Sequence, residues 1–440
     1  MNFGAAIINI TPQRPTPNYT GVTISEGANG FRCRAAVFGE TELHGILSID
    51  TMAIDGPTVL EIRAQLKAAG VPGVWWVNAT HNHLAPPITR LFLCEEQPNK
   101  NYKDQLFSWI IQAAGEACDN LEESTVRHGI SAAPGFEFNR RLKGEDGVVM
   151  AFSPELPRVI EALGPVDSEV PYITFQNKSQ VKGIIFSYAN HNNASGIGEE
   201  HAYFDWDLGG YACEKLQNAL GEECTAIFLP GAAGDIAWID PKNPQPSSAE
   251  LATHIGRSLA GNILESLPKA ELQEENSVQN KTVRSYIYDR SPRASEYCED
   301  ACRGSDPKAL ASARNRYSAE REAVEKATAT GLEIEISSIS IGAGIALISL
   351  PSEVFSETGI FIRKHSPFKT TIIAELTNGY CGYVPTAEAF EQGGYETHRS
   401  VYTSRLSKDA DRQLRSMAAD SLERGQHDIT YDSEVVRNNQ

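Results

Sequence analysis

Two histidines separated by one residue, His81 and His83, directly follow an apolar run that begins at Val74. A third histidine, His191, follows the apolar run 184–189, and Glu353 follows the run 345–350. Two neutral imidazoles and one carboxylate form the usual open zinc site, in which water completes the coordination. Zinc lowers the pKa of that water to about 7 and polarises a carbonyl oxygen, as the hydrolysis of an amide or ester requires.

Each of these residues also has an ordinary structural explanation when it is taken alone. A His-x-His pair can be incidental, and a single His191 is more often a hydrogen-bonded histidine of the core. Glu353 could cap or pair at a strand end, and residues 231–234 could form a plain glycine turn with Asp235 as a helix cap. The prediction of a site therefore depends on all of them lying at matching strand ends.

Other catalytic sites fit the sequence less well. An iron oxygenase also uses two histidines and a carboxylate, but its ligands usually include a His-x-Asp/Glu pair, whereas the pair here is His-x-His. A serine hydrolase is disfavoured because no Gly-x-Ser-x-Gly occurs and the residue just past the glycine turn is Ala237. A phosphate-binding loop is disfavoured because no Lys-Ser/Thr follows the glycines.

Apolar runs of about five to eight residues alternate with helix-like stretches, which predicts an α/β fold with a mixed β-sheet core flanked by helices. Ligands of open α/β sheets sit beyond the carboxyl ends of the strands, so we expect the metal site there. The runs that end in polar or glycine residues are 74–80, 184–189, 226–229, 345–350 and 372–376. The predicted helices are 57–69, 103–122, 206–219, 249–266 and 307–328, and two further strands are expected at 332–341 and 345–350.

The chain is expected to form one catalytic domain over residues 1–425, followed by a polar tail at 426–440. Residues 268–330 turn polar and charged and have too few apolar side chains for a core of their own. We therefore predict a polar helical lobe over 268–330 within the domain. No internal repeat is visible in the sequence.

The composition excludes several classes of protein. With 41% hydrophobic and 22% charged residues the chain is globular, and its net charge of −18 works against binding nucleic acid. No apolar run approaches the roughly 20 residues that a membrane-spanning helix needs. The N-terminus lacks a basic segment of the secretory kind, so the chain as given is expected in the cytoplasm unless an export signal has been removed. Its oligomeric state cannot be read from these patterns.

Taken together, the motifs resemble the neutral (non-lysosomal) ceramidase family, particularly its bacterial relatives, from Gly4 to about Tyr402. The order and spacing of so many motifs make a chance resemblance improbable. The matching segments are 4–12, Thr80-His-Asn-His83, Phe138-Asn-Arg140, Gly164-Pro-Val-Asp167, Ala189-Asn-His191, Gly231-Ala-Ala-Gly-Asp235, Leu350-Pro-Ser-Glu353, 378–388 and Gly393-Gly-Tyr-Glu396.

The resemblance implies a role for individual residues. His81, His191 and Glu353 match the zinc ligands of the family, and Tyr383 matches a phenol oxygen ligand that zinc chemistry alone would not have selected. The residues that match those around the substrate amide and its developing oxyanion are His83, Arg140 and Tyr395. Donors of this kind suit a tetrahedral intermediate. Without the resemblance, a surface salt bridge for Arg140 and core packing for Tyr395 would be the simpler explanations.

The sequence also departs from the family. Ala237 stands where ceramidases carry a serine that contacts the lipid head group, and Ser352 replaces the glycine before the glutamate. The C-terminal immunoglobulin-like domain is missing from this chain. The resemblance therefore transfers the metal site and the class of reaction, but not the substrate.

We accordingly expect a Zn²⁺-dependent hydrolase that cleaves a carboxamide bond of a small N-acyl amide by attack of zinc-bound hydroxide on the carbonyl. Two alternatives stay open. The same zinc site could act on an ester or a lactone, or the chain could be a non-catalytic binding protein that retains the fold.

Overall fold

The computed structural model describes residues 1–440 except 19–20, 25–26, 28, 92–98, 146, 154–155, 197–202, 290–319, 321, 327–329, 424–428 and 431–440. Of residues 429–430 only the backbone is described. Most of the predicted tail at 426–440 and most of the predicted helix at 307–328 therefore lie outside the described part.

Among the described residues, three five-stranded sheets form the framework. The first, in spatial order, contains β6 (Val74–Ala79), β5 (Leu43–Ile49), β4 (Arg32–Gly39), β1 (Asn2–Asn9) and β7 (Glu122–Glu123). The second contains β14 (Thr225–Pro230), β13 (Gln180–Tyr188), β12 (Glu169–Asn177), β8 (Thr125–Ala132) and β16 (Glu271–Gln273). The third contains β21 (Thr370–Glu375), β19 (Ile345–Leu350), β18 (Gly331–Ile341), β17 (Val278–Tyr288) and β23 (Ile429–Thr430).

Four strands of each sheet share one topology, whereas the fifth strand differs: β7 and β16 pair antiparallel and β23 pairs parallel. In each, a central strand pairs antiparallel with both neighbours, and the last of these three strands crosses over through a helix to a parallel strand at the sheet edge. The crossover helices are α1 (Gly56–Ala68), α3 (Asp207–Leu220) and α6 (Ser356–His365). A second helix then follows: α2 (Lys100–Asp119), α4 (Ala249–Ser266) or α8 (Ala410–Leu422).

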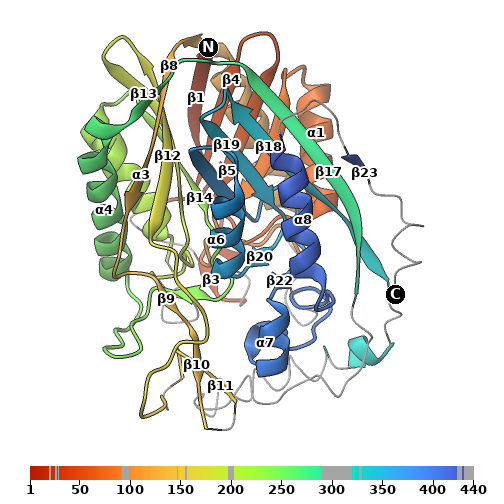
Figure 1. Ribbon diagram of the computed structural model, residues 1–440. Coiled ribbons are helices and arrows are strands. Elements are labelled where there is room, and N and C mark those ends of the chain that lie inside the picture. Colours follow the sequence, from red (N-terminus) through yellow and green to blue (C-terminus); the bar gives the residue numbers. More distant parts are fainter. Residues whose placement is uncertain are drawn as a thin grey trace.

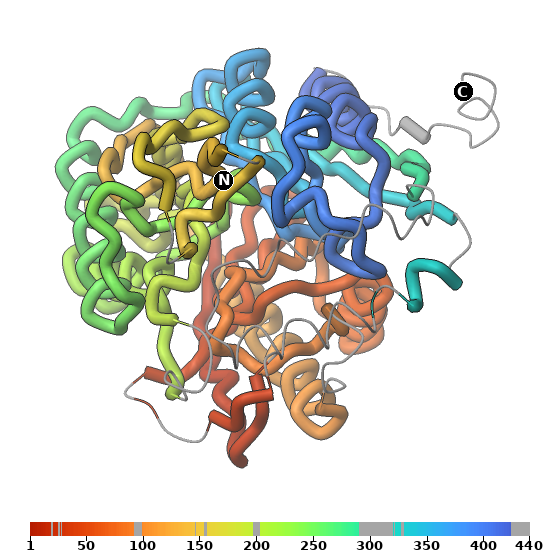
Figure 2. Tube along the Cα trace, turned by 90° about the horizontal axis from the view of Figure 1, so that it is seen from below, coloured from red at the N-terminus to blue at the C-terminus, as the bar shows by residue number. Residues whose placement is uncertain are grey.

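The chain therefore contains three units of the same topology, at residues 2–123, 125–273 and 278–430. Figure 2 shows them side by side around a common centre, the first in red and orange, the second in yellow and green, the third in cyan and blue. No repeat is visible in the sequence, because the units share strand order and patterning rather than recognisable sequence.

Packing follows from the alternation of side chains along each strand. One face of every sheet contributes to a central apolar cluster that includes Phe38 and Trp76 from the first sheet, Ile185 from the second and Leu347 from the third. The opposite face of each sheet packs against the two helices of its own unit. Figure 1 shows this for α3 and α4, which cover the outer side of the second sheet.

The fold confirms the α/β class, the helices flanking mixed sheets, and the strands predicted to end in polar residues. The polar helical lobe over 268–330 is a wrong prediction in part, because residues 278–288 form β17, an eleven-residue strand paired along its length with β18. Of the rest, the described residues 322–326 are helical. No described helix is long and apolar enough to cross a membrane.

Short paired segments complete the structure near the strand ends. They are β2 (Thr16–Pro17) with β3 (Thr23–Ile24), β9 (Phe138–Asn139) with β15 (Ile236–Ala237), β10 (Arg141–Lys143) with β11 (Val148–Met150), and β20 (Glu353–Val354) with β22 (Tyr383–Val384). The remaining short helices are α7 (Ala387–Gln392) and the 3₁₀ turns at Leu267–Lys269 and Tyr395–Thr397.

Candidate metal centre

The three parallel strand pairs joined by the crossover helices end at equivalent positions, and the candidate ligands lie just beyond these ends. The last paired residues are Ile49 with Ala79, Tyr188 with Pro230, and Leu350 with Glu375. His191 and Glu353 each lie three residues beyond the last paired residue of β13 and of β19. His81 and His83 follow the end of β6, so all three units supply side chains to one centre.

The histidines meet through their Nε2 atoms. Nε2 of His81 lies 3.1 Å from Nε2 of His191 and 3.2 Å from Nε2 of His83. One ligand atom from each of these three imidazoles lies within 4.8 Å of the other two, and all three side chains are buried. Oε2 of Glu353 lies 3.4 Å from Nε2 of His81 and 3.6 Å from Nε2 of His191.

Hydrogen bonds on the far side of the rings decide which nitrogen faces the centre. Nδ1 of His81 donates to the Met52 carbonyl oxygen at 2.8 Å, and Nδ1 of His191 donates to the Ala233 carbonyl oxygen at 3.0 Å. A carbonyl can only accept, so Nδ1 of each ring carries a proton, and Nε2 is the nitrogen that faces the centre. Such contacts typically orient metal-binding histidines.

The electrostatic environment keeps two of these rings neutral. Burial lowers the pKa of His191 well below its usual value, and the nearby Arg140 guanidinium and His81 add to the effect. Burial likewise lowers the pKa of His83, with further contributions from His81 and Arg140. Neutral imidazoles are the form that binds metal.

Glu353 presents one oxygen to the centre. The Tyr380 hydroxyl donates to Oε1 at 2.8 Å, whereas Oε2 is buried and accepts no hydrogen bond from the described residues. Burial opposes ionisation of this carboxyl, but the adjacent His81 and Arg140 outweigh it and hold its pKa below the usual value. A buried, unsatisfied carboxylate oxygen is costly unless a cation completes it.

These residues fit a metal ion. Two inward-facing imidazole nitrogens and one unsatisfied carboxylate oxygen lie close enough together to share one ion, and His83 adds a third nitrogen. His81 also has a φ of 63°, a left-handed conformation that is uncommon outside glycine and is often found at functional sites. Its ring therefore reaches the centre from a turn just beyond the end of β6.

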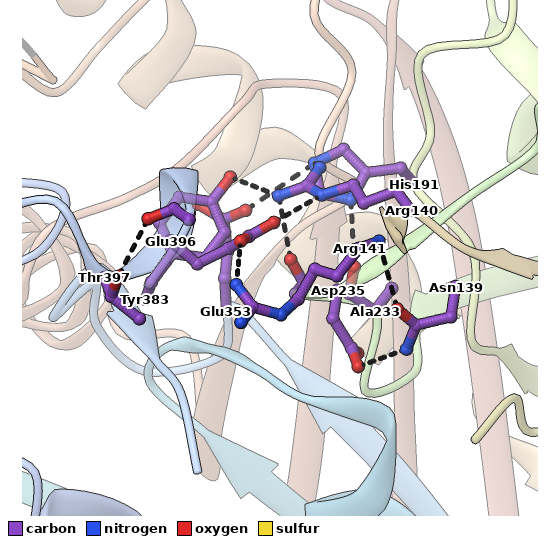
Figure 3. Close-up of polar contacts among 12 residues, drawn as sticks. Asn139, Arg140, Arg141, His191, Ala233, Asp235, Glu353, Tyr383, Glu396 and Thr397 are labelled. Atoms are coloured by element: carbon purple, nitrogen blue, oxygen red, sulfur yellow. Dashed lines mark hydrogen bonds and ion pairs between the residues drawn. The ribbon is translucent and has the colours of Figure 1, made fainter. Parts of the chain in front are cut away.

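Arg140 lies against the same centre, from the segment between β9 and β10 (Figure 3). Its Nε donates to Oε1 of Glu396 at 2.8 Å, and its Nη2 donates to the Gly234 carbonyl oxygen at 2.8 Å and to the Tyr383 hydroxyl at 3.2 Å. Its Nη1 lies 3.3 Å from Nε2 of His191. Arg140 is 3% exposed, so it is no surface salt bridge.

The two tyrosines of the predicted site lie together. Tyr383 pairs with Glu353 across the short parallel ladder of β20 and β22, and its ring meets that of Tyr395 edge-on at 5.7 Å between centroids. The Arg140 guanidinium lies 5.5 Å from the ring centre of Tyr383 and 5.8 Å from that of Tyr395. Burial raises the pKa of the Tyr383 phenol, as does the charge of Glu353.

The structure brings all seven predicted residues to one centre, although the role of each remains a prediction. They are His81, His83, Arg140, His191, Glu353, Tyr383 and Tyr395. Sequence reasoning missed Tyr380 and Glu396, which contact Glu353 and Arg140 from neighbouring loops. Both lie within motifs that carry the family resemblance, but nothing in the motifs shows what they contact.

Ala237, the position at which ceramidases carry a serine, is fully buried in β15. It pairs with Phe138 of β9, and the chain continues from β9 to Arg140. The substitution therefore lies beside the segment that positions the arginine.

Comparison with known proteins agrees with the resemblance at the level of fold. No protein-family model matches the sequence, and no curated protein matches it by sequence. Among solved structures, neutral ceramidase from Pseudomonas aeruginosa aligns with a TM-score of 0.70 at 16% identity, over 98% of this chain and 76% of that one. A ceramidase complexed with C2 aligns with a TM-score of 0.71 at 16% identity and the same coverage. The chain therefore has the fold of neutral ceramidase over nearly its whole length.

Proposed function

We propose that this protein is a zinc-dependent hydrolase that cleaves the carboxamide bond of a small N-acyl amide. His81, His191 and Glu353 would hold the ion, with the Tyr383 phenol as a fourth ligand. Two imidazoles and one carboxylate suit zinc and leave positions open for water and substrate. The single observation that carries the proposal is the buried, unsatisfied Oε2 of Glu353 beside two Nε2 atoms that face the centre.

When bound, zinc supplies an activated water near neutral pH and a Lewis acid for the carbonyl oxygen. The remaining steps belong to the side chains. Arg140 has three of its N–H donors bound to Glu396, Gly234 and Tyr383, which leaves Nη1 directed at the centre. A cation fixed in this way stabilises negative charge that develops on a carbonyl oxygen.

His83 and Tyr395 would complete the reaction. His83 is buried and its pKa is lowered, so at neutral pH it is an unprotonated base that can take a proton from the attacking water and pass it to the leaving amine. Tyr395 lies beside Arg140 and Tyr383, where its hydroxyl can donate to the same developing oxyanion.

The test combines elemental analysis with a matched substrate panel. We expect about one zinc per chain, and hydrolysis of N-acyl amides that stops with a chelator and returns with zinc. Each amide is paired with the ester of the same acyl group, and faster turnover of the esters alone would reassign the bond that is cleaved. His191→Ala should lose both zinc and activity, whereas His254→Ala, an exposed histidine of α4, should retain both. A wild-type protein that takes up no metal after reconstitution would refute the proposal.

A further inference from the structure

We infer that Tyr380 is a positioning residue that fixes the Glu353 carboxylate so that it binds a metal through Oε2 alone. The inference rests on the metal site of the proposed function and goes beyond it, because it assigns the way in which the carboxylate binds. A zinc site that hydrolyses amides needs a free position for water. A carboxylate that turned to bind through both oxygens would occupy that position.

The hydrogen-bond pattern distinguishes the two oxygens of Glu353. An ionised carboxylate offers two equivalent oxygens, and either or both can bind a cation. The Tyr380 hydroxyl donates to Oε1 at 2.8 Å, while Oε2 is left beside His81 and His191. The hydrogen bond holds Oε1 away from the centre and sets the rotation of the carboxylate plane.

The backbone around Tyr380 is held on both sides. Before it, the Asn378 N–H donates to the Val77 carbonyl oxygen at 2.8 Å, and Oδ1 of Asn378 accepts from the Val77 N–H at 3.0 Å. After it, the Cys381 N–H donates to the Pro351 carbonyl oxygen at 2.7 Å. The loop between β21 and β22 is therefore fixed to the first unit and to the end of β19.

The Tyr380 ring has its own anchor. It packs against the apolar cluster formed by Met52, Ala53 and Leu91 of the first unit. Met52 is also the residue whose carbonyl oxygen accepts from His81. Met52 therefore accepts a hydrogen bond from His81 through its carbonyl and belongs to the cluster against which Tyr380 packs.

Tyr380→Phe removes the hydroxyl and keeps the ring in its apolar contact. We expect the affinity for Zn²⁺, measured by competition with a chromophoric chelator, to fall about 10–100-fold, as is typical when an outer contact of a metal ligand is lost. With Co²⁺ in place of zinc, the visible spectrum should weaken as the freed carboxylate binds through both oxygens and raises the coordination number. Tyr172→Phe, which removes a hydroxyl of β12 that contacts Ser266 of α4, should change neither quantity.

A double-mutant cycle shows whether Tyr380 acts by orienting the Glu353 carboxylate or by stabilising the site in general. Tyr380→Phe added to Glu353→Gln should cause no further loss of Zn²⁺ affinity, because the hydroxyl acts through the carboxylate. Wild-type affinity and an unchanged Co²⁺ spectrum in Tyr380→Phe would overturn the inference and leave the zinc hydrolase intact. Additive losses would also overturn it. A wild-type protein that binds neither metal would overturn both proposals.

Discussion

An imidazole offers a metal one nitrogen at a time, and the partner of the other nitrogen decides which one it is. In His81 and His191 that partner is a backbone carbonyl, supplied by Met52 and Ala233. Both carbonyls belong to turns just beyond strand ends, so the backbone fixes the rings before any ion arrives. The remaining question at the residue scale is whether His83 is a ligand or a base.

Substitution with glutamine separates the two roles of histidine. We expect His191→Gln to lose most of its bound zinc, because a ligand is gone. His83→Gln should keep about one zinc per chain and lose about 10²–10⁴-fold in kcat, the usual contribution of a general acid or base. Elemental analysis and steady-state kinetics on the same preparations give both values. If His83→Gln loses zinc as His191→Gln does, three imidazoles hold the ion and the base lies elsewhere.

Glu396 holds the arginine. Its Oε1 accepts from Arg140 and its Oε2 from Nη1 of Arg141 at 2.7 Å, and all three side chains are buried. Glu396→Gln removes the carboxylate that pairs with two buried guanidinium groups, so we expect the free energy of unfolding to fall by about 3–5 kcal/mol. Since Arg140 then loses its fixed orientation, kcat should fall more than KM changes.

Arg141→Met is the matched control for Glu396. It breaks the ion pair at the other carboxylate oxygen and leaves the Arg140 contact in place. Urea unfolding should show a loss of stability, while kcat stays nearer to the wild-type value. An equal fall of kcat in both variants would show that Glu396 acts only through the stability of its loop.

Residues of the centre were predictable where a local pattern marks them. His81, His191 and Glu353 each follow an apolar strand directly, and the ends of such strands meet. Tyr380 and Glu396 carry no such signal, because the residues that they contact are distant in the sequence. Glu396 contacts an arginine 256 residues before it, and no local spacing encodes that contact.

At the level of elements, the three units are joined by hydrogen bonds to the edge strands of their sheets. Edge strands expose unpaired backbone groups that must be covered. The Ser48 hydroxyl donates to the Phe228 carbonyl oxygen of edge strand β14 at 2.8 Å. In the same way, the Ser187 hydroxyl donates to the Ile373 carbonyl oxygen of edge strand β21 at 2.6 Å. Ser48 and Ser187 occupy equivalent positions, each one residue before the last paired residue of its strand.

The third junction uses backbone and amide groups. The Ala79 N–H of edge strand β6 donates to the Leu376 carbonyl at 3.1 Å, and Asn378 binds both backbone groups of Val77. This is the loop that carries Tyr380. The closure of the sheets and the geometry of the centre are therefore set by the same segment.

Removing one of these serine contacts should weaken the junction between units. Ser187→Ala leaves the Ile373 carbonyl without this buried donor, so we expect a loss of about 1–3 kcal/mol in the free energy of unfolding. Ser108→Ala removes an exposed hydroxyl on α2 and should leave stability within about 0.5 kcal/mol of the wild type. Chemical denaturation of both variants measures the difference, and equal stabilities would show that the junction does not depend on the hydroxyl.

Most helices and strands followed from periodicity, since apolar positions at helical or alternating spacing mark a buried face. The helix 249–266 was predicted with its observed bounds. β17 was missed because the stretch 268–330 around it is polar and charged, and its ladder with β18 lies beyond what the local sequence shows. In that case long-range pairing overrides local composition.

At the scale of the whole molecule, the candidate ligands come from all three units. Binding of an ion should therefore stabilise the folded arrangement of the three units. Anything that binds the native state alone stabilises it, by about 2.7 kcal/mol at a free concentration one hundred times Kd. We expect a chelator to lower Tm and zinc to restore it in a concentration-dependent way. A thermal shift assay tests this, with His191→Ala as the variant that should not respond. Equal Tm values with and without zinc would contradict a metal that bridges the units.

The arrangement of three units could not be predicted, because their sequences share only patterning. Met52, His191 and Glu353 occupy equivalent positions in the three units. Each lies three residues beyond the last paired residue of the strand that precedes the crossover helix. A closed ring of three identical subunits must present the same group three times at its axis. Because the three units of this protein belong to one polypeptide, their residues at this equivalent position can differ. They are a methionine, whose carbonyl accepts from His81, a histidine and a glutamate. The three sides of the centre therefore carry unlike groups, which differ in what they would offer to the two ends of an asymmetric ligand.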